Sequence, residues 1–455
     1  MPQIFPWLTL VSIIWLQSIS STNTDFPAYS STLKSRLGIT QLQLNNLAVS
    51  YWQYFLLQAL AGNSICWFNT TCYVAAMRSF AVDDGFVIGL STSYAGLSAK
   101  LYVALAQLIA GRDLSSKSIY LLLNCFVPLG LSLLTAPFLK ETTPVRSGAA
   151  SSLLAVFVIA GATGVYVVVE SIFLSSEHSI LMPIILLIMV GLVAAVPLFK
   201  ALERVQDCDE VQVGAENRKR GFGGGSVEEG EGVENEENLR EEGCIRALQK
   251  SVKRVEFWLY FLVYLCGGTV GLVYANNLGQ IAESRNVNED VLLSISSSFT
   301  FFGRLSSAPL SLFTTSRRKY IISRPGLVAI LMVPISSSFL LLLSSSKTCL
   351  FISTGIIGMC TGAITSVAVS MTSDLFGPEN FSVDHNLIVA NIPIGSLLFG
   401  YIAALVYDKG ADNKGVCIGV VCYRTTFITW GSICSLGTIL SVVLYIRTRG
   451  YLLNT

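Results

Sequence analysis

The sequence predicts an all-α protein, a polytopic bundle of about twelve transmembrane helices. Hydrophobic residues make up 52% of the 455-residue chain and charged residues only 13%, about half the usual charged share of soluble proteins. Apolar runs of about 20 residues also recur along the chain, and a helix of that length crosses the roughly 30 Å hydrocarbon core of a bilayer. We therefore expect an integral, multi-pass membrane protein that contacts the lipid bilayer.

Twelve apolar runs are long enough to be membrane spans, six on each side of a polar central segment. They cover residues 5–21, 51–77, 86–111, 118–138, 151–174, 180–199, 257–279, 291–313, 326–345, 349–372, 386–407 and 425–446. The first run has two interpretations, a membrane helix or a cleaved secretory signal, because it is short and ends in small residues. The residues before it lack the positive charge that is typical of a signal, which favours the membrane helix.

The polar segment at residues 200–256 divides the chain. It is dense in charge, and Gly221 and the run 223–225 interrupt any helix, so it cannot bury enough apolar surface to offset its ordering entropy. The expected organisation is an N-terminal membrane domain at 1–199, a flexible linker at 200–256, a C-terminal membrane domain at 257–446 and a tail at 447–455.

The distribution of basic residues predicts which side of the membrane each loop occupies. With the linker and both termini in the cytosol, 19 of the 30 Lys and Arg residues lie in cytosolic segments, 9 lie in the opposite loops and two lie within spans. Cytosolic loops of membrane proteins are enriched in Lys and Arg. We therefore predict a cytosolic linker and cytosolic termini.

Two cations fall at membrane depth, where ionisable groups are costly and mark functional sites by default. Lys100 lies midway along the third span, and it either holds an anionic substrate group or a proton-coupled carboxylate, or pairs structurally with a carbonyl or a hydroxyl such as Ser98. Arg304 lies past the middle of the eighth span, where it either anchors the helix near a gate or contacts the substrate.

Amides supply a second group of candidate substrate-binding residues. Asn63 and Asn69 lie six residues apart in the second span, where their side chains could line a polar cavity. Asn276, Asn277 and Gln280 end the seventh span; Asn276 and Gln280 share a helical face by their spacing. Two interpretations stay open for this last group, a gate or substrate contact and a hydrogen-bonded helix end.

The remaining residue types exclude several function classes. Eleven cysteines without a CxxC motif and only two histidines give little from which to build a metal site. The net charge of +1 offers no general attraction to nucleic acid, and no nucleophile–base set or Gly-rich phosphate loop indicates an enzyme or a bound cofactor. Cys417 and Cys422 lie in the last non-cytosolic loop, where a local disulfide and two free thiols are equally compatible with the sequence.

Nine stretches together resemble a known family. They are WLQSIS, TQLQLNNLAV, GNSICWFNT, GLSTSYAGLSAKLY, NNLGQIAES, FFGRL, SDLFGPENF, HNLIVANIPIGSLLFGYIAALVYD and CIGVVCYRTTF. In this order they are similar to the plant nodulin-like, nuclear fusion defective 4-like branch of the major facilitator superfamily. The resemblance implies a transporter-like fold in two halves, a nodulin-like N-terminal part and an unknown substrate. The expected partner is a small solute, with proton coupling as one option.

The chain departs from this family at Ser50–Tyr51. Relatives continue there through a second and a third membrane helix, whereas Ser50 leads directly into a segment that resembles the fourth. Loss of an even number of helices preserves the orientation of everything that follows. The resemblance therefore leaves two functions open, secondary transport and a non-transporting scaffold or inactive remnant or splice form.

Overall fold

A computed structural model describes most of both hydrophobic regions. The described residues are 4–20, 52–80, 84–110, 116–139, 145, 150–173, 181–199, 249–314, 323–411 and 417–452. Residues 200–248 of the predicted linker, the Ser50–Tyr51 junction and the last three residues of the predicted tail lie outside this range. Helix accounts for nearly all of the described residues, so the all-α prediction is confirmed.

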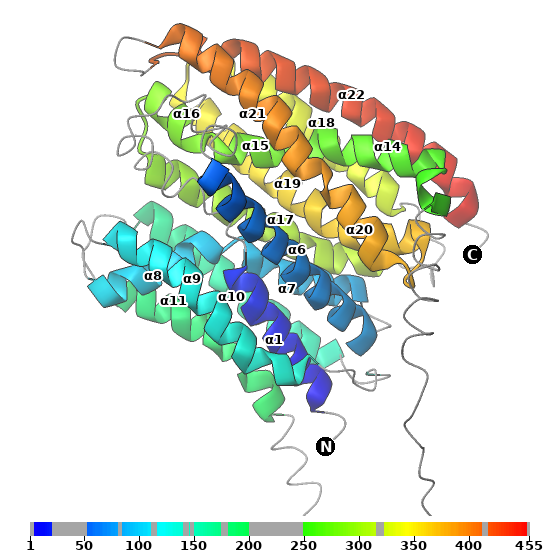
Figure 1. Cartoon of the computed structure of the whole chain (residues 1–455). Helices are drawn as coiled ribbons and strands as arrows, with labels where there is room; N and C mark the ends of the chain where they lie inside the picture. The colour runs from blue at the N-terminus through cyan, green and yellow to red at the C-terminus, as the bar shows by residue number, and fades with distance from the viewer. Residues whose placement is uncertain are drawn as a thin grey trace, which may run out of the picture.

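The helices before the linker form what we call the N-terminal half. They are α1 (Phe5–Ile19), α6 (Trp52–Ser79), α7 (Asp84–Ala95), α8 (Ser98–Ala110), α9 (Ser116–Thr135), α10 (Ala150–Phe173) and α11 (Leu181–Leu192), with a short 3₁₀ turn, η1 (Ala136–Phe138), after α9. Each of the six spans predicted for this half falls on one or two of these helices. In Figure 1 they run from blue to green in the lower part of the molecule.

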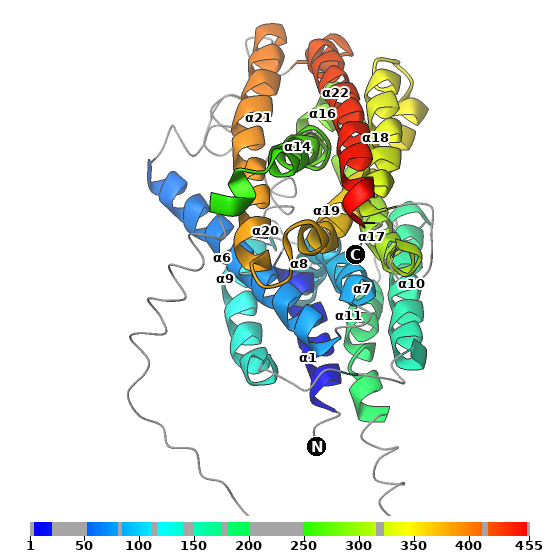
Figure 2. The same cartoon turned by 90° about the vertical axis from the view of Figure 1, so that its right-hand side faces the viewer.

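The helices after the linker form the C-terminal half, which lies above the N-terminal half in Figures 1 and 2. They are α14 (Val255–Tyr264), α15 (Val270–Asn276), α16 (Leu278–Ser284), α17 (Glu289–Thr314), α18 (Arg324–Leu341), α19 (Lys347–Phe376), α20 (Phe381–Val389), α21 (Asn391–Gly410) and α22 (Val421–Leu452), with a π-helical segment, η2 (Leu265–Thr269), between α14 and α15. Helix α14 begins at Val255, inside the predicted linker range of 200–256.

Length and apolarity identify six stretches of the described chain that can each cross a membrane. They are Ala150–Glu170, Val255–Asn276, Arg324–Leu341, Lys347–Phe376, Phe381–Gly410 and Val421–Arg449. Shorter apolar helices occupy Phe5–Ile19, Ser98–Ile109, Leu122–Phe138 and Leu181–Leu192. Both groups coincide with runs that the sequence marks as spans, and the chain is a multi-pass membrane protein.

Local changes in helical geometry interrupt several predicted spans, among them those at 86–111 and 257–279. The span at 86–111 breaks between α7 and α8, where the Gly96 N–H donates to the carbonyl of Ser93 at 2.9 Å and closes a tighter turn. The span at 257–279 widens into the π-helical η2, whose sequence LCGGT contains two adjacent glycines. Single π-turns inside α-helices are often found at functional sites. Here the π-turn follows directly after Tyr264.

Ion pairs close one end of the bundle, which we call the linker end because α11 ends there and α14 begins there. Arg324 at the start of α18 pairs with Asp374 at the end of α19. Arg447 near the end of α22 pairs with Glu256 at the start of α14, with Nη2 and Oε1 3.0 Å apart. These contacts place the ends of four helices of the C-terminal half together, and Figure 1 shows the C-terminus on this side.

Apolar burial is organised as one main cluster per half. The cluster of the C-terminal half gathers side chains from α14 through α22, with Trp430, Phe427 and Phe339 among its fully buried aromatic residues. The cluster of the N-terminal half extends across into the other half, because it includes Phe301 and Ala308 of α17. The two halves are therefore packed together through α17 rather than joined only by the linker.

Candidate functional site

The candidate site is the surface along which the two halves meet, which we call the seam. Its main part is α7 from the N-terminal half packed against α17 of the C-terminal half; α10 also packs against α17, and α7 against α19. Close approach requires glycine on α7: a Cβ at Gly89 would lie 2.6 Å from the backbone nitrogen of Ala308, and one at Gly96 would lie 3.0 Å from that of Phe301. Small residues allow helices to approach closely in lipid, where the hydrophobic effect does not draw them together.

Hydroxyl groups bridge the seam near its centre. Thr92 Oγ1 of α7 lies 2.9 Å from Ser366 Oγ of α19, and Ser366 Oγ lies 2.6 Å from Ser307 Oγ of α17. All three side chains are buried. Such interhelical hydrogen bonds in membranes contribute about 0.6 kcal/mol on average, so this network aligns the halves without fixing them permanently.

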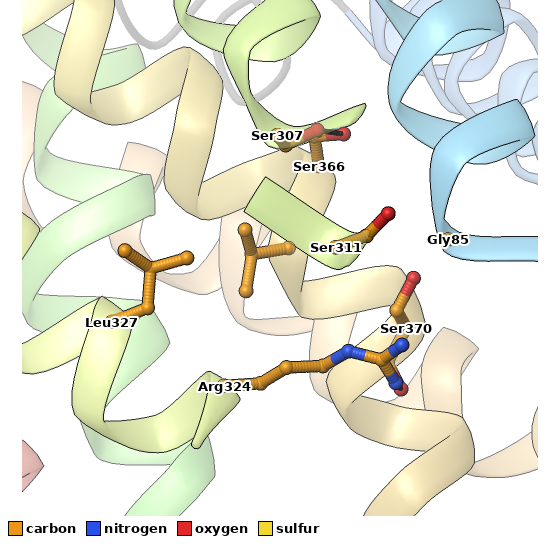
Figure 3. Close-up of a pocket in the computed structure, with 8 residues that line it drawn as sticks. Gly85, Ser307, Ser311, Arg324, Leu327, Ser366 and Ser370 are labelled. Carbon is orange, nitrogen blue, oxygen red and sulfur yellow. Dashed lines mark hydrogen bonds between the residues drawn. The ribbon is translucent and has the colours of Figure 1, made fainter. Parts of the chain in front are cut away.

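A small polar pocket lies beside this hydroxyl network, on its linker side. It is lined by Gly85, Ser307, Ser311, Arg324, Leu327, Ser366, Val367 and Ser370. Figure 3 shows Ser307 and Ser366 in contact above it, Ser311 directed toward Gly85, and the Arg324 side chain extended toward Ser370. The Arg324 guanidinium donates to the carbonyl of Ser370 at 3.0 Å. The pocket has room for about one water-sized sphere, too little for an organic solute.

Arg304 lies on α17 at the seam. Its Nη1 donates to the backbone carbonyl of Thr92 at 3.2 Å, which joins the C-terminal half to α7 of the N-terminal half. Its Nε is buried and has no hydrogen-bond partner among the described residues. A buried guanidinium N–H without a partner costs about 1–3 kcal/mol or more, so this side chain retains hydrogen-bonding capacity that the described residues do not use.

Two tyrosines lie within the electrostatic reach of Arg304, Tyr73 on α6 and Tyr264 at the end of α14. They come from different halves. The Tyr73 ring meets the rings of His385 and Phe381 edge-on, at centroid distances of 5.4 and 6.4 Å. Arg304 therefore has neighbours on α6 and α14 as well as its hydrogen-bond partner on α7.

Lys100 occupies a different environment from Arg304. It lies in the first turn of α8, and its Nζ lies 3.2 Å from Oε2 of Glu170 on α10. Both residues belong to the N-terminal half, and their side chains are 18% and 29% exposed. The sequence suggested a hydroxyl or a carbonyl as the structural partner, whereas the structure supplies an acid 70 residues away. This pairing neutralises Lys100 within its own half.

The predicted amides lie on α6, α15 and α16 and at the junction between the last two. Asn69 is half-buried on α6, and Asn63 lies on the same helix with its side chain outside the described range. Asn276 ends α15, and Asn277, buried at the junction with α16, donates through Nδ2 to the carbonyl of Val273 at 2.8 Å. Such a bond is compatible with the interpretation of a hydrogen-bonded helix end.

Gln280 keeps the alternative interpretation open. Its side chain is 2% exposed, and its Oε1 has no hydrogen-bond partner among the described residues. The helix break between Asn276 and Leu278 separates it from Asn276, so the shared helical face predicted from their spacing is interrupted. Gln280 therefore remains a candidate polar contact near the end opposite the linker.

The end opposite the linker holds the two predicted loop cysteines. Cys417 and Cys422 form a disulfide with Cα atoms 5.8 Å apart. The Cys417 N–H also donates to the hydroxyl of Tyr407 at 3.2 Å, which ties this loop to α21. Within the part of the chain that the structure describes, no group of three or more His, Cys, Asp or Glu side chains could hold a metal ion.

Several residues of the seam were not predicted from the sequence. Thr92, Ser307 and Ser366 are hydroxyl residues within apolar runs. Many other Ser and Thr side chains in these spans donate hydrogen bonds to the backbone of their own helix, so the residue type alone does not mark a contact between helices. Tyr73 and Tyr264 resemble ordinary aromatic core residues. The available signal was the density of small and hydroxyl residues in GLSTSYAG and SVAVS, which indicates helix packing without identifying the partner helix.

The fold and the seam define a membrane-embedded helical protein of two halves. Comparison with known families agrees with this class. The Nodulin-like family model matches residues 6–51 and 48–201, and the model of the NFD4 C-terminal domain matches residues 240–453. The chain is also 36% identical over 97% of its length to Protein NUCLEAR FUSION DEFECTIVE 4 of Arabidopsis thaliana, of which it covers 89%. The chain belongs to this Nodulin-like, NFD4 family.

A more distant relative is named as a probable transporter. Probable transporter MCH1 of Yarrowia lipolytica is 23% identical over 189 residues, which cover 38% of this chain and 39% of that protein. Two solved transporter structures align over nearly the whole chain. A bacterial homolog of the human lysosomal transporter Spinster is 13% identical, with 98% of this chain and 97% of that chain covered and a TM-score of 0.42. The nucleoside transporter NupG is also 13% identical, with 97% of this chain and 99% of that chain covered and a TM-score of 0.42.

The family match is interrupted where the sequence suggests a loss. The Nodulin-like model matches in two pieces that meet at residues 48–51. The alignment with the Arabidopsis relative runs over 522 positions, which exceeds the 455 residues of this chain by 67. That difference is enough for two membrane helices of about 20 residues each with their loops.

Proposed function

We propose that the protein is a secondary transporter, of the major facilitator kind, which moves a small solute along the seam by alternating access. The observation that carries this proposal is the hydrogen bond of Arg304, which crosses from one half to the other. Arg304 is a cation within the run 291–313 that the sequence marks as a membrane span. Ionisable groups at this depth are retained where they face a pathway or a partner. Transporter sites of this kind lie near the bilayer midplane between structural repeats.

The contacts across the seam are suited to opening and closing. They include glycine-mediated approach and hydroxyl hydrogen bonds, such as that between Thr92 and Ser366. Glycine contacts leave no interlocked side chains to separate. In the proposed cycle the halves part at the linker end, the solute leaves, and the same contacts re-form. The linker and both termini are proposed to be cytosolic, which places the linker end at the cytosolic face.

Cross-linking the seam tests this function. The protein with Thr92→Cys and Ser366→Cys is reconstituted into liposomes, and uptake of a panel of labelled organic anions, sugars, amino acids and nucleosides is measured before and after oxidation. Uptake of one class above protein-free liposomes should disappear on oxidation and return on reduction, while the two single variants are unaffected. Undiminished uptake by protein that gel analysis shows to be cross-linked would exclude movement at the seam.

A second candidate function is supported by the interrupted family match. A chain that lacks two helices of its family has lost part of the wall of a cavity between the halves, so it could be a scaffold or an inactive remnant. The matched experiment inserts the corresponding segment of the Arabidopsis relative between Ser50 and Tyr51. Uptake only by the extended chain would assign the remnant function, and equal uptake by both chains would remove it.

A further inference from the structure

We infer that Arg304 binds a carboxylate group, and that the solute is a small organic monocarboxylate. The inference deepens the proposed transport function and rests on it for its biological meaning, but binding is tested separately from uptake. It is carried by the hydrogen bonds, the charge and the neighbours of Arg304. Each of these restricts the class of ligand further.

The hydrogen bonds of Arg304 leave one edge of the guanidinium available. Nη1 donates a hydrogen bond to the carbonyl of Thr92, and Nε has no hydrogen-bond partner among the described residues. Nε and Nη2 present parallel N–H groups along the edge that does not contain Nη1. A carboxylate accepts such a pair in bidentate geometry, and a guanidinium favours this arrangement over a single contact. The open edge therefore fits a planar two-oxygen acceptor.

The charge of Arg304 favours a monoanion. No acidic side chain among the described residues forms an ion pair with it, whereas Lys100 pairs with Glu170 and Arg324 pairs with Asp374. An uncompensated cation is costly in a low-dielectric interior, and one opposite charge with good hydrogen bonds offsets that cost. A dianion such as phosphate at neutral pH would leave an excess negative charge. One carboxylate gives a neutral pair.

The two tyrosines indicate an organic rather than an inorganic anion. Tyr73 and Tyr264 lie within the electrostatic reach of Arg304, one from each half. Tyr264 is 4% exposed, and the structure gives its hydroxyl no hydrogen bond to another described residue. Aromatic walls with a few polar groups are typical of sites for small organic molecules, and a phenol hydroxyl can donate to a carboxylate oxygen. A ligand held there would contact both halves at once.

Thermal unfolding of the purified protein tests the inference without requiring transport. Pyruvate and benzoate are added over a concentration series, with benzamide as the neutral isostere of benzoate and inorganic phosphate as the dianion, all at constant ionic strength. We expect a saturable rise in Tm with at least one of the two carboxylates and none with benzamide. Arg304→Gln should abolish the rise, and Arg304→Lys should weaken the apparent affinity about tenfold or more because it loses the bidentate fork.

A matched control and a measurement on the unmodified protein keep the test independent of folding. Arg447→Gln removes another arginine, which pairs with Glu256 at the linker end, and should leave the rise in Tm unchanged. In wild-type protein, labelling of Arg304 by phenylglyoxal, read by mass spectrometry of its peptide, should fall when pyruvate or benzoate is present. This second measurement does not depend on any variant.

The outcomes separate the inference from the transport proposal. Stabilisation by phosphate alone, no response to either carboxylate, or an equal response in the Arg304→Gln variant would each overturn the inference. Carboxylate binding that depends on Arg304, in a protein without uptake of any solute, would leave the inference standing and remove the transport function. Uptake of a neutral solute by protein that does not bind carboxylate would support the transport function and overturn the inference.

Discussion

Adding one methyl group at Gly89 should open the seam. Gly89 lies on α7 where it faces α17, and a Cβ at this position would lie 2.5 Å from Oγ of Ser307, 2.6 Å from the backbone nitrogen of Ala308 and 2.9 Å from its Cα. Real Cβ atoms essentially never come within 3.0 Å of such atoms. A side chain could rotate away, but the backbone of α17 cannot. Gly89→Ala therefore requires the two helices to move apart.

The size of the effect follows from the cost of overpacking. Inserting a methyl group into a packed interior costs about 1–3 kcal/mol. Because only the state in which the halves are in contact meets this cost, the ratio of closed to open protein should fall roughly 5- to 150-fold. The higher helix propensity of alanine favours both states equally, since α7 is helical in each.

Cross-linking at a second contact between the halves measures this change. Thr70 of α6 donates to Oδ1 of Asn386 in α20 at 3.1 Å, away from Gly89. Thr70→Cys with Asn386→Cys should form a disulfide more slowly when Gly89→Ala is also present. Gly161→Ala on α10 is the matched control, because a Cβ there has nothing within 4 Å, and it should leave the rate unchanged. Equal rates with Gly89→Ala and Gly161→Ala would refute a seam closed through glycine.

Three further predictions concern the ion pairs and the disulfide. Asp374→Asn should lower the Tm, because it leaves the buried Arg324 without its acid, and the double variant with Arg324→Gln should lose less than the sum of the two single variants. A double-mutant cycle on Lys100→Met and Glu170→Gln, followed by thermal unfolding, should give a coupling energy of about 0.5 kcal/mol or more, and a coupling of zero would contradict the observed pair. Replacing both Cys417 and Cys422 with serine should destabilise the protein by about 2 kcal/mol in chemical unfolding, and two free thiols at these positions in unreduced protein would contradict the disulfide.

The helical framework was predictable because its cause is local. Runs of about 20 apolar residues determine where helices cross a membrane, and every predicted span coincides with helix in the described chain. The interruptions within these helices were not predictable, because they depend on contacts with residues far away in the sequence. Gly96 ends α7 where the backbone of Phe301 approaches it. The π-helical η2 packs beside Asn391, whose Oδ1 accepts a bond from Thr269 at 2.5 Å.

The candidate site could be predicted only in part. The cost of a charge in a membrane selected Lys100 and Arg304 as candidates, but their sequence positions did not say which of them pairs with an acid. The partner of Lys100 is Glu170, 70 residues away, whereas the hydrogen bond of Arg304 reaches Thr92, 212 residues away. Such long-range partners depend on how the two halves dock. The hydrophobic pattern within each half does not encode that docking.

Movement of the halves at the linker end is the central claim, and a distance measurement across that end tests it most directly. Spin labels are placed at the exposed Leu198, beyond α11 in the N-terminal half, and at the exposed Glu379, between α19 and α20. Pulsed electron paramagnetic resonance in nanodiscs then gives their distance distribution. We predict at least two populations, with a ratio that Gly89→Ala shifts toward the longer distance. A single narrow distribution, identical in wild-type and Gly89→Ala protein, would contradict the account.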